Sequence, residues 1–187
     1  AAAFVRAYYG RVADEDIAGR PPEALCAAAL SLWEFAAIRQ PGEAKIRVFN
    51  PEAKSHGWDS GHSVVEIVND DMPFLVDSAT MALRQQGLAI YGVIHPIVAV
   101  RRDKGARRLS LEPAAGGGAI AESAMHVEIS RQGDPRLHAD IADRLRAALA
   151  DVRAAVDDWP PMLQRLQDCI RDLDETPPPL SAEEVAE

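Results

Sequence analysis

The sequence of 187 residues has no apolar run long enough to span a bilayer, and no secretory signal peptide heads it. It has only two cysteines, Cys26 and Cys169, which we expect as free thiols buried on apolar helix faces, in a reducing compartment. Basic residues are also few, at 20 against 29 acidic ones, and the formal charge of −9 disfavours nucleic acid as a partner. Neither a membrane nor a nucleic acid is therefore an expected partner.

The motifs of common catalysts are missing too. The sequence contains no dinucleotide-binding G-x-G-x-x-G, no phosphate-binding G-x-x-x-x-G-K-[ST] and no nucleophile elbow G-x-S-x-G. The three glycines at 116–118 are interpreted as a flexible tip, and Ser60 near His62 as a solvated turn. No C-x-x-C or H-E-x-x-H brings metal ligands together, so no metal site is expected. We therefore expect no catalytic residue and no bound cofactor in this segment.

Residues 63–87 form the most informative stretch. A β-branched strand over 63–68 runs into a tight turn, and a helix is predicted to open behind Pro73. Asp71 is the expected N-cap, because its carboxylate can accept hydrogen bonds from the first amides of the helix. Gly87 is expected to close the helix as a C′ residue with positive φ.

Hydrophobic periodicity predicts the other elements. Helices are expected over 4–12, 23–36, 135–159 and 162–173, and strands over 45–49, 88–102, 107–111 and 125–129. Because Pro96 cannot donate to a ladder, a bulge or an edge position is expected near His95-Pro96. Trp159-Pro160-Pro161 is expected to end the first of the two C-terminal helices.

From residue 63 onward the predicted order is β-α-β-β-α. That order predicts an α+β, ferredoxin-like antiparallel sheet with both helices on one face. In the strand 125–129, His126 and Glu128 alternate with apolar residues, which predicts one solvated face. The strand 45–49 is expected to pair as a hairpin with 63–68, in place of a missing closing strand.

The chain is expected to divide into three parts. Residues 1–42 form an N-terminal helical segment, 43–159 the α+β domain, and 160–187 a C-terminal helix with a proline-rich linker. The first residues read as the middle of a helix and the last as the start of another. We therefore expect the sequence to be a piece of a longer polypeptide.

A basic patch lies at the predicted hairpin tip, formed by Arg101, Arg102, Arg107 and Arg108. Such residues most often make a solvated strand edge that prevents aggregation. They are also suited to docking an acidic surface of a partner protein. Both interpretations of the patch stay open from the sequence.

Three stretches of the sequence resemble the N-terminal region of the large bacterial NAD-dependent glutamate dehydrogenases. They are Ile46 to Pro51 (IRVFNP), His56 to His62 (HGWDSGH) and Val64 to Ser78 (VVEIVNDDMPFLVDS). The similarity continues through His95-Pro96, Arg102-Asp103 and 123–129. The resemblance implies a long cytoplasmic chain that oxidises L-glutamate to 2-oxoglutarate and ammonia with NAD. Its catalytic domains would lie far C-terminal to this segment, which would be an ACT-like module.

The same resemblance implies an effector site at the turn after the first strand. In ligand-binding ACT domains this turn reads approximately D-x-P-G, and the glycine lets an amino acid approach the helix. Here Asp71 and Pro73 are kept, but Phe74 replaces the glycine, and its benzyl group is expected to fill the groove of the ligand. The candidate effector-binding residues are Asn69, Asp70, Asp71, Met72, Pro73 and Phe74.

Three functions stay open from the sequence. The first is a non-catalytic ACT-like module for the assembly, and as a further role the regulation, of a homo-oligomeric glutamate dehydrogenase. The second is a sensor that binds an amino acid at residues 69–75. The third is a stand-alone adaptor whose basic tip at 101–108 binds an acidic partner.

Overall fold

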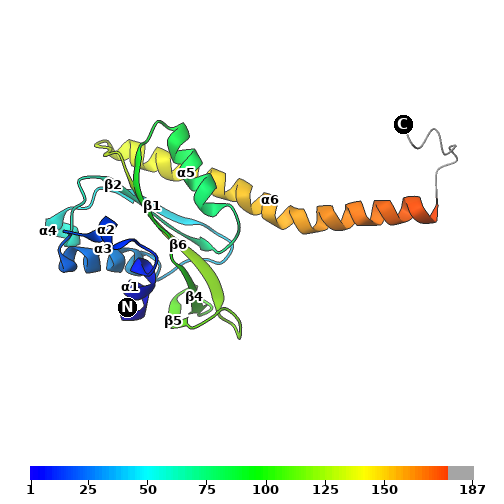
Figure 1. The fold of residues 1–187 in the computed structure, drawn as a ribbon, viewed down its shortest axis with the longest axis horizontal. Coiled ribbons are helices and arrows are strands. Elements are labelled where there is room, and N and C mark those ends of the chain that lie inside the picture. The colour runs from blue at the N-terminus through cyan, green and yellow to red at the C-terminus, as the bar shows by residue number, and fades with distance from the viewer. Residues whose placement is uncertain (177–187) are drawn as a thin grey trace. The chain divides into compact units, whose positions relative to one another are not determined.

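The computed structural model of the protein describes residues 1–176 and builds a six-stranded antiparallel sheet with helices around it (Figure 1). The strands are β1 (Lys45–Phe49), β2 (Ser63–Asp70), β3 (Ile90–Ile94), β4 (Ile97–Arg102), β5 (Arg108–Glu112) and β6 (Ile120–Ile129). The helices are α1 (Ala2–Tyr9), α2 (Asp14–Ile17), α3 (Pro22–Phe35), α4 (Ala53–His56), α5 (Leu75–Gln85) and α6 (Pro135–Glu175). The predicted α+β, ACT-like fold is confirmed. The helix start predicted near the C-terminus and most of the proline-rich linker lie outside the described residues.

Strands β2 and β6 form the middle of the sheet, whose order is β1-β2-β6-β4-β5, with β3 also paired to β6. Strands β3 and β4 follow one another along the same side of β6. The break between them falls at His95-Pro96, where the sequence predicts an irregular strand. Pro96 has no amide hydrogen to donate, but its carbonyl accepts a bond from the amide of Ala124 at 3.0 Å.

The hairpin of β1 and β2 is also confirmed. Lys45 lies opposite Val68 and Phe49 lies opposite Val64 in an antiparallel ladder. Strand β1 therefore takes one outer position of the sheet, as the sequence predicts for the missing closing strand.

Both faces of the sheet are covered. Even-numbered residues of β2 face the N-terminal helices, since Val64 packs with Ala28 of α3 and Val68 packs with Phe4 of α1. The odd-numbered Val65 and Ile67 are buried as well. Because side chains alternate across a strand, a second layer must cover them. Helix α5 and the first part of α6 form that layer (Figure 1), with Leu75, Ala79, Leu83, Leu145 and Leu149 buried.

The start of α5 differs from the prediction. Strand β2 continues through Asp70, and the amide of Asp71 still donates to the carbonyl of Ala121 at 3.0 Å. The helix begins at Leu75, and its N-cap is Phe74, so the prediction of Asp71 as the cap is wrong. The sheet pairing holds the backbone extended beyond the predicted turn, which moves the carboxylate of Asp71 out of capping position.

The end of α5 follows the prediction. Gly87 has φ of +74°, and its amide donates to the carbonyl of Arg84 at 2.9 Å. The amide of Leu88 donates to the carbonyl of Leu83 at 3.3 Å. These two bonds form a Schellman motif, in which glycine takes the left-handed conformation at low cost.

Helix α6 contradicts two predictions. It runs through Pro160 and Pro161 without a break, although the sequence predicts an end there. Each proline removes only one hydrogen-bond donor, and on an exposed helix water can solvate the carbonyls left without a donor. Cys169 on this helix is exposed, as is Cys26 on α3, so the predicted burial of both thiols is wrong.

The described chain forms one compact unit that ends at Val152, and a second unit begins at Arg153. Within residues 1–176, no helix is both long enough and apolar enough to cross a bilayer. The candidate sites described below lie in the first unit.

Candidate functional site

The structure divides the six predicted effector residues between two environments. Asn69 and Asp70 belong to β2, where Asn69 is buried. Both carboxylate oxygens of Asp70 are engaged, because Oδ1 accepts from Nη2 of Arg39 at 2.6 Å and Oδ2 accepts from the amide of Gly42 at 2.8 Å. Asp70 therefore ties residues 39–42 to the sheet. The connection to α5 consists of the remaining four residues, Asp71, Met72, Pro73 and Phe74.

Two exposed residues of this connection, Asp71 and Phe74, stand out. Within residues 1–176, the carboxylate of Asp71 has no hydrogen bond or ion pair. Phe74 has φ of +69°, the left-handed conformation that the glycine of a D-x-P-G turn adopts without strain. Phe74 is 67% exposed, so it fills no groove formed by residues 1–176, contrary to expectation.

The charge of Asp71 acts on a histidine beside a cleft. Burial lowers the pKa of His95, the nearby Asp71 carboxylate opposes this effect, and Arg11 adds to it. His95 lies in the break between β3 and β4 and lines a cleft of about 480 Å³ together with Arg11 and Asp16. Its Nε2 lies 2.6 Å from Oγ of Ser123, which is fully buried. The histidine and serine therefore offer no exposed nucleophile.

A smaller cleft of about 150 Å³ adjoins the first one and shares Val12 and Asp16 with it. It is lined by Arg20, His126 and Glu128. Nδ1 of the buried His126 has no hydrogen-bond partner within the described chain. The two clefts thus present cationic, anionic and neutral polar groups, which suits the binding of a small polar molecule rather than covalent chemistry.

Two of the four arginines of the basic tip, Arg102 and Arg108, are engaged in contacts within the domain. Arg102 binds both carboxylate oxygens of Glu122, at 2.7 and 2.8 Å, and the carbonyls of Ala36 and Ala106. The guanidinium of Arg108 lies 3.0 Å from the ring centre of Trp33 and donates to its carbonyl.

The other two arginines of the tip reach solvent. Both Arg107 and Arg101 are exposed, and Nε of Arg101 lies 3.3 Å from Oε1 of Glu112. The predicted contact with an acidic partner stays a prediction for these two. Arg102 and Arg108 instead hold the N-terminal segment to the sheet.

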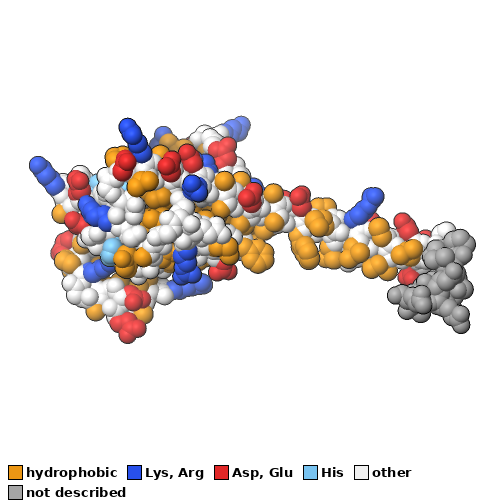
Figure 2. All heavy atoms as spheres, turned by 90° about the horizontal axis from the view of Figure 1, so that it is seen from above, with side chains coloured by type: hydrophobic (Ala, Val, Ile, Leu, Met, Phe, Trp, Pro, Cys, Tyr) orange, Lys and Arg blue, Asp and Glu red, His pale blue; other side chains and the backbone are white. Residues whose placement is uncertain are grey.

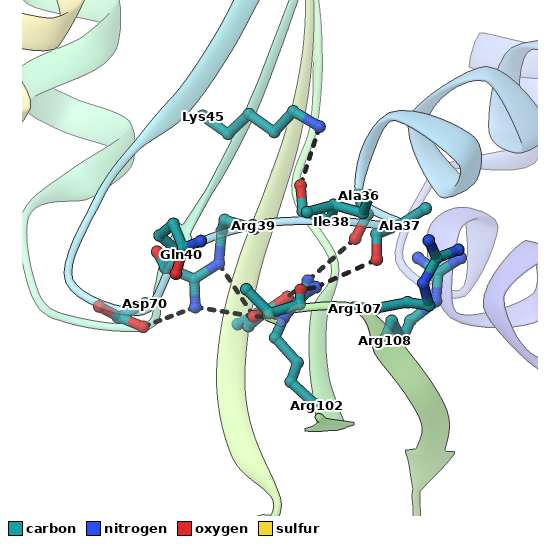
Figure 3. Close-up of polar contacts among 12 residues, drawn as sticks. Ala36, Ala37, Ile38, Arg39, Gln40, Lys45, Asp70, Arg102, Arg107 and Arg108 are labelled. Atoms are coloured by element: carbon teal, nitrogen blue, oxygen red, sulfur yellow. Dashed lines mark hydrogen bonds and ion pairs between the residues drawn. The ribbon is translucent and has the colours of Figure 1, made fainter. Parts of the chain in front are cut away.

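Three glutamates lie on the sheet face beneath the N-terminal helices, and each takes a partner from that segment. Oε1 of Glu66 accepts from the hydroxyl of Ser31 at 2.9 Å. Oε1 of Glu122 accepts from Arg39 at 2.7 Å, in a cluster that also contains Arg102 (Figure 3). Figure 3 shows Arg39 pointing between this cluster and Asp70. The charge of Glu66 is paired with Arg47 of β1, whose Nη2 lies 2.6 Å from Oε2.

Glu128 is the third of these acids. Burial alone would raise the pKa of its carboxyl, but hydrogen bonds and charges from His126 and Arg20 outweigh burial and lower the pKa to about 2. Nη2 of Arg20 lies 3.0 and 3.1 Å from the two oxygens. Nδ1 of His62 lies 3.4 Å from Oε2. The carboxylate is thus held in its charged form.

Comparison with known proteins identifies the family. A family model described as "Glutamate dehydrogenase, ACT1 domain" matches residues 4–145, most of the chain. The chain belongs to the glutamate dehydrogenase ACT1 domain family.

Relatives of this ACT1 domain are much longer proteins. The NAD-specific glutamate dehydrogenase of Halomonas elongata is 33% identical over 177 residues, which are 94% of this chain and 11% of that protein. That of Pseudomonas aeruginosa is 28% identical over 186 residues, 98% of this chain and 12% of that protein. That of Mycobacterium tuberculosis is 26% identical over 132 residues. The chain therefore spans about a tenth of the length of these curated relatives.

Sequence reasoning missed the polar groups that join the helices of the ACT1 domain to its sheet. The alternation of His126 and Glu128 with apolar residues is interpreted as a solvated face, but both side chains are buried. The ring of His126 lies 5.9 Å from the ring of Tyr8 in α1, and Glu128 is bound by Arg20 of the N-terminal segment. That interpretation is wrong. The sequence signal for these contacts is an arginine beyond each end of α3, Arg20 before it and Arg39 after it. Each of them binds an acidic residue on a strand.

Proposed function

We propose that this ACT1 domain is a non-catalytic module that supports assembly, and through it regulation, of an NAD-dependent glutamate dehydrogenase. The observation that carries the proposal is the match to the ACT1 family over residues 4–145, within relatives about ten times longer. The parent chain would oxidise L-glutamate to 2-oxoglutarate and ammonia with NAD, at domains outside this segment. In this proposal the enzyme is cytoplasmic and NAD binds elsewhere in the chain.

The sheet supports the assembly role through its outer strand. Strand β1 has ladder bonds only to β2 among the described residues, so its other side can pair with a strand of another chain. The opposite outer strand is partly covered, because Arg107 bridges to Ile38 and the amide of Arg108 donates to the carbonyl of Ala37 at 2.8 Å. Of these two outer strands, β1 is therefore the one better suited to assembly.

The assembly role is tested in the parent enzyme by removing residues 1–176. We expect a smaller assembly in light scattering, or a changed response to amino acids, while the remaining chain still reduces NAD. The matched control is Arg136→Ala in the complete enzyme, which should change neither property because that exposed side chain lies outside the basic tip, β1 and residues 156–173. An enzyme of unchanged mass and unchanged response would refute the proposal, as would complete loss of NAD reduction in a folded remainder.

A second function, amino-acid sensing at residues 69–75, has support from Asp71. A carboxylate without a partner in the described chain can hold an α-amino group, and the exposed benzyl group of Phe74 leaves the turn accessible. Calorimetric titration with common amino acids tests this role on the 187-residue chain. Binding heat that disappears in Asp71→Asn but persists in Asp77→Asn supports sensing. No heat and no thermal shift with any amino acid removes it.

A further inference from the structure

The part of α6 after Arg153 carries an exposed apolar side. Trp159, Leu163, Leu166, Ile170 and Leu173 are between 42% and 63% exposed. Figure 2 shows hydrophobic side chains gathered along this part of the helix. A long exposed apolar stripe on a soluble protein marks a surface that binds another molecule.

The spacing of the stripe specifies the kind of partner. Successive members are separated alternately by three and four residues: Val156, Trp159, Leu163, Leu166, Ile170 and Leu173. This is the a and d pattern of three heptads, with a period of 3.5 residues that suits a left-handed pair of helices. A helix packed on a broad domain surface needs no such strict repeat. The spacing therefore favours a second helix that runs along this one.

The identity of the seam residues favours a two-stranded parallel pair. The a positions are Val156, Leu163 and Ile170, of which two are β-branched, and leucine fills two of the three d positions. Branched residues at a with leucine at d favour two parallel strands over higher assemblies. Such a pair of identical sequences brings each a residue next to its own copy.

The flanking positions allow two identical helices to approach. From 156 to 173 every charged residue lies at position b, c or f, away from the seam: Asp157, Asp158, Arg165, Asp168, Arg171 and Asp172. The e and g positions hold Pro160, Met162, Gln167 and Cys169, none of them charged. Like charges at e and g would oppose self-pairing, and here they are absent from this range. Pro160 and Pro161 fall at e and f, outside the a and d contacts.

We propose that residues 156–173 form a parallel two-stranded coiled coil with the same segment of a second copy of this chain. The proposal rests on the assembly role proposed above and names one contact through which copies associate. This contact on α6 is separate from pairing through the outer edge of β1.

The first test measures the mass of the 187-residue chain by light scattering over a range of concentrations, for the wild type and two variants. Leu166→Glu places a charge in the seam, and Gln164→Glu adds the same charge at an outer b position. We expect a dimer in the wild type and in Gln164→Glu, and a Kd raised about a hundredfold in Leu166→Glu. Because residue 166 is exposed in the single chain, far-ultraviolet circular dichroism should show both variants folded.

The second test determines the orientation of the helices. Leu173→Cys is introduced after Cys26 and Cys169 have been changed to Ser, and the protein is oxidised. In a parallel pair the two thiols lie in one layer and form a covalent dimer. In an antiparallel pair they lie at opposite ends of a seam roughly 25 Å long, at 1.5 Å rise per residue, and remain free. Free thiols in a dimeric protein would overturn the parallel arrangement.

Other outcomes separate the coiled coil from the assembly role. A monomeric wild type, or a dimer that persists in Leu166→Glu, overturns the coiled coil and leaves pairing through β1 untouched. A dimer lost in Leu166→Glu supports the coiled coil. If the parent enzyme with the same substitution then keeps its full mass, the coiled coil stands but its proposed part in assembly fails.

Discussion

Arg39 is fully buried and donates two hydrogen bonds to one oxygen of Glu122, from Nε at 2.9 Å and from Nη2 at 2.7 Å. The arginine follows α3, and the glutamate lies on β6, 83 residues later in the chain. Nη2 of Arg39 also binds Asp70 on β2. One side chain therefore connects the N-terminal segment to the two central strands of the sheet.

We expect Arg39→Ala to lower the free energy of unfolding by about 3 kcal/mol, the lower end for a broken buried ion pair, because Arg102 still binds Glu122. Urea denaturation of both proteins measures the difference. The control is Arg107→Ala, which removes an exposed charge and should change stability by less than about 0.5 kcal/mol. An equal decrease in the free energy of unfolding in the two variants would show that the buried ion pair stabilises the fold no more than an exposed charge does.

The lowered pKa of Glu128 should make the free energy of unfolding depend on pH. The pKa of its carboxyl group is about 2 in the folded protein, against 4.5 for a glutamate without these interactions. Ionisation of Glu128 therefore stabilises the folded state. The resulting stability is fully present above pH 4.5 and is lost as the pH falls toward 2. Glu128→Gln, which cannot ionise, should therefore be less stable at pH 7 by about 2–3 kcal/mol, and the difference should shrink below pH 4.5.

Thermal or urea unfolding at pH 7, 4.5 and 3 measures this difference. The control is Glu112→Gln, since Glu112 is a partly exposed acid whose pKa is lowered by hydrogen bonds from Ser110 and Arg101. It should show a smaller change with pH, because solvent screens an exposed charge. A gap between wild type and Glu128→Gln that stays constant from pH 7 to 3 would contradict the ion-pair explanation.

The sequence predicted the sheet well because its signals are local. The alternating strand 45–49, the proline at 96 and the glycine at 87 each act through their own backbone, and all three appear where they were expected. The cap at Asp71 failed because pairing between β2 and β6 extends the strand through Asp70. Ladder bonds to a partner 52 residues away are not visible in the local pattern.

The burial of His126 and Glu128 shows a second limit. Alternation established that the two side chains share a face, but it did not show what covers that face. The cover is the N-terminal segment, whose helix α1 places the buried Tyr8 ring 5.9 Å from the ring of His126. In the sequence, only the arginines that pair with these acids, such as Arg20, indicate that the N-terminal segment covers this face. The candidate clefts beneath α1 and α2 were unpredictable for the same reason.

The backbone of Phe74 predicts a stabilising substitution. A residue with a side chain costs roughly 1–2 kcal/mol in the left-handed conformation, and glycine avoids this cost but loses about 0.5–1 kcal/mol of chain entropy. Phe74→Gly should therefore raise the free energy of unfolding by about 0.5–1 kcal/mol. Phe74→Ala is the control, because it removes the exposed ring and keeps the strain. Equal stability of the two variants in urea would show that the strain is negligible.

Pro160 and Pro161 predict a change confined to the second unit. They deprive the carbonyls of residues 156 and 157 of helical donors, and an interior proline costs about 3 kcal/mol relative to alanine. Replacing both by alanine should slow hydrogen exchange of the amides in 153–175 and leave exchange in the sheet unchanged. Exchange is measured at a concentration where the chain is monomeric, so that pairing of helices does not contribute.

The matched control for the prolines is Gln164→Ala on the same helix. It removes one side-chain contact, from Nε2 of Gln164 to Asp168 at 3.0 Å, and should alter exchange only slightly. If the alanine pair leaves exchange in 153–175 unchanged, the helix is already continuous and stable with both prolines. Faster exchange would instead mean that the prolines favour the helix, which their missing donors give no reason to expect.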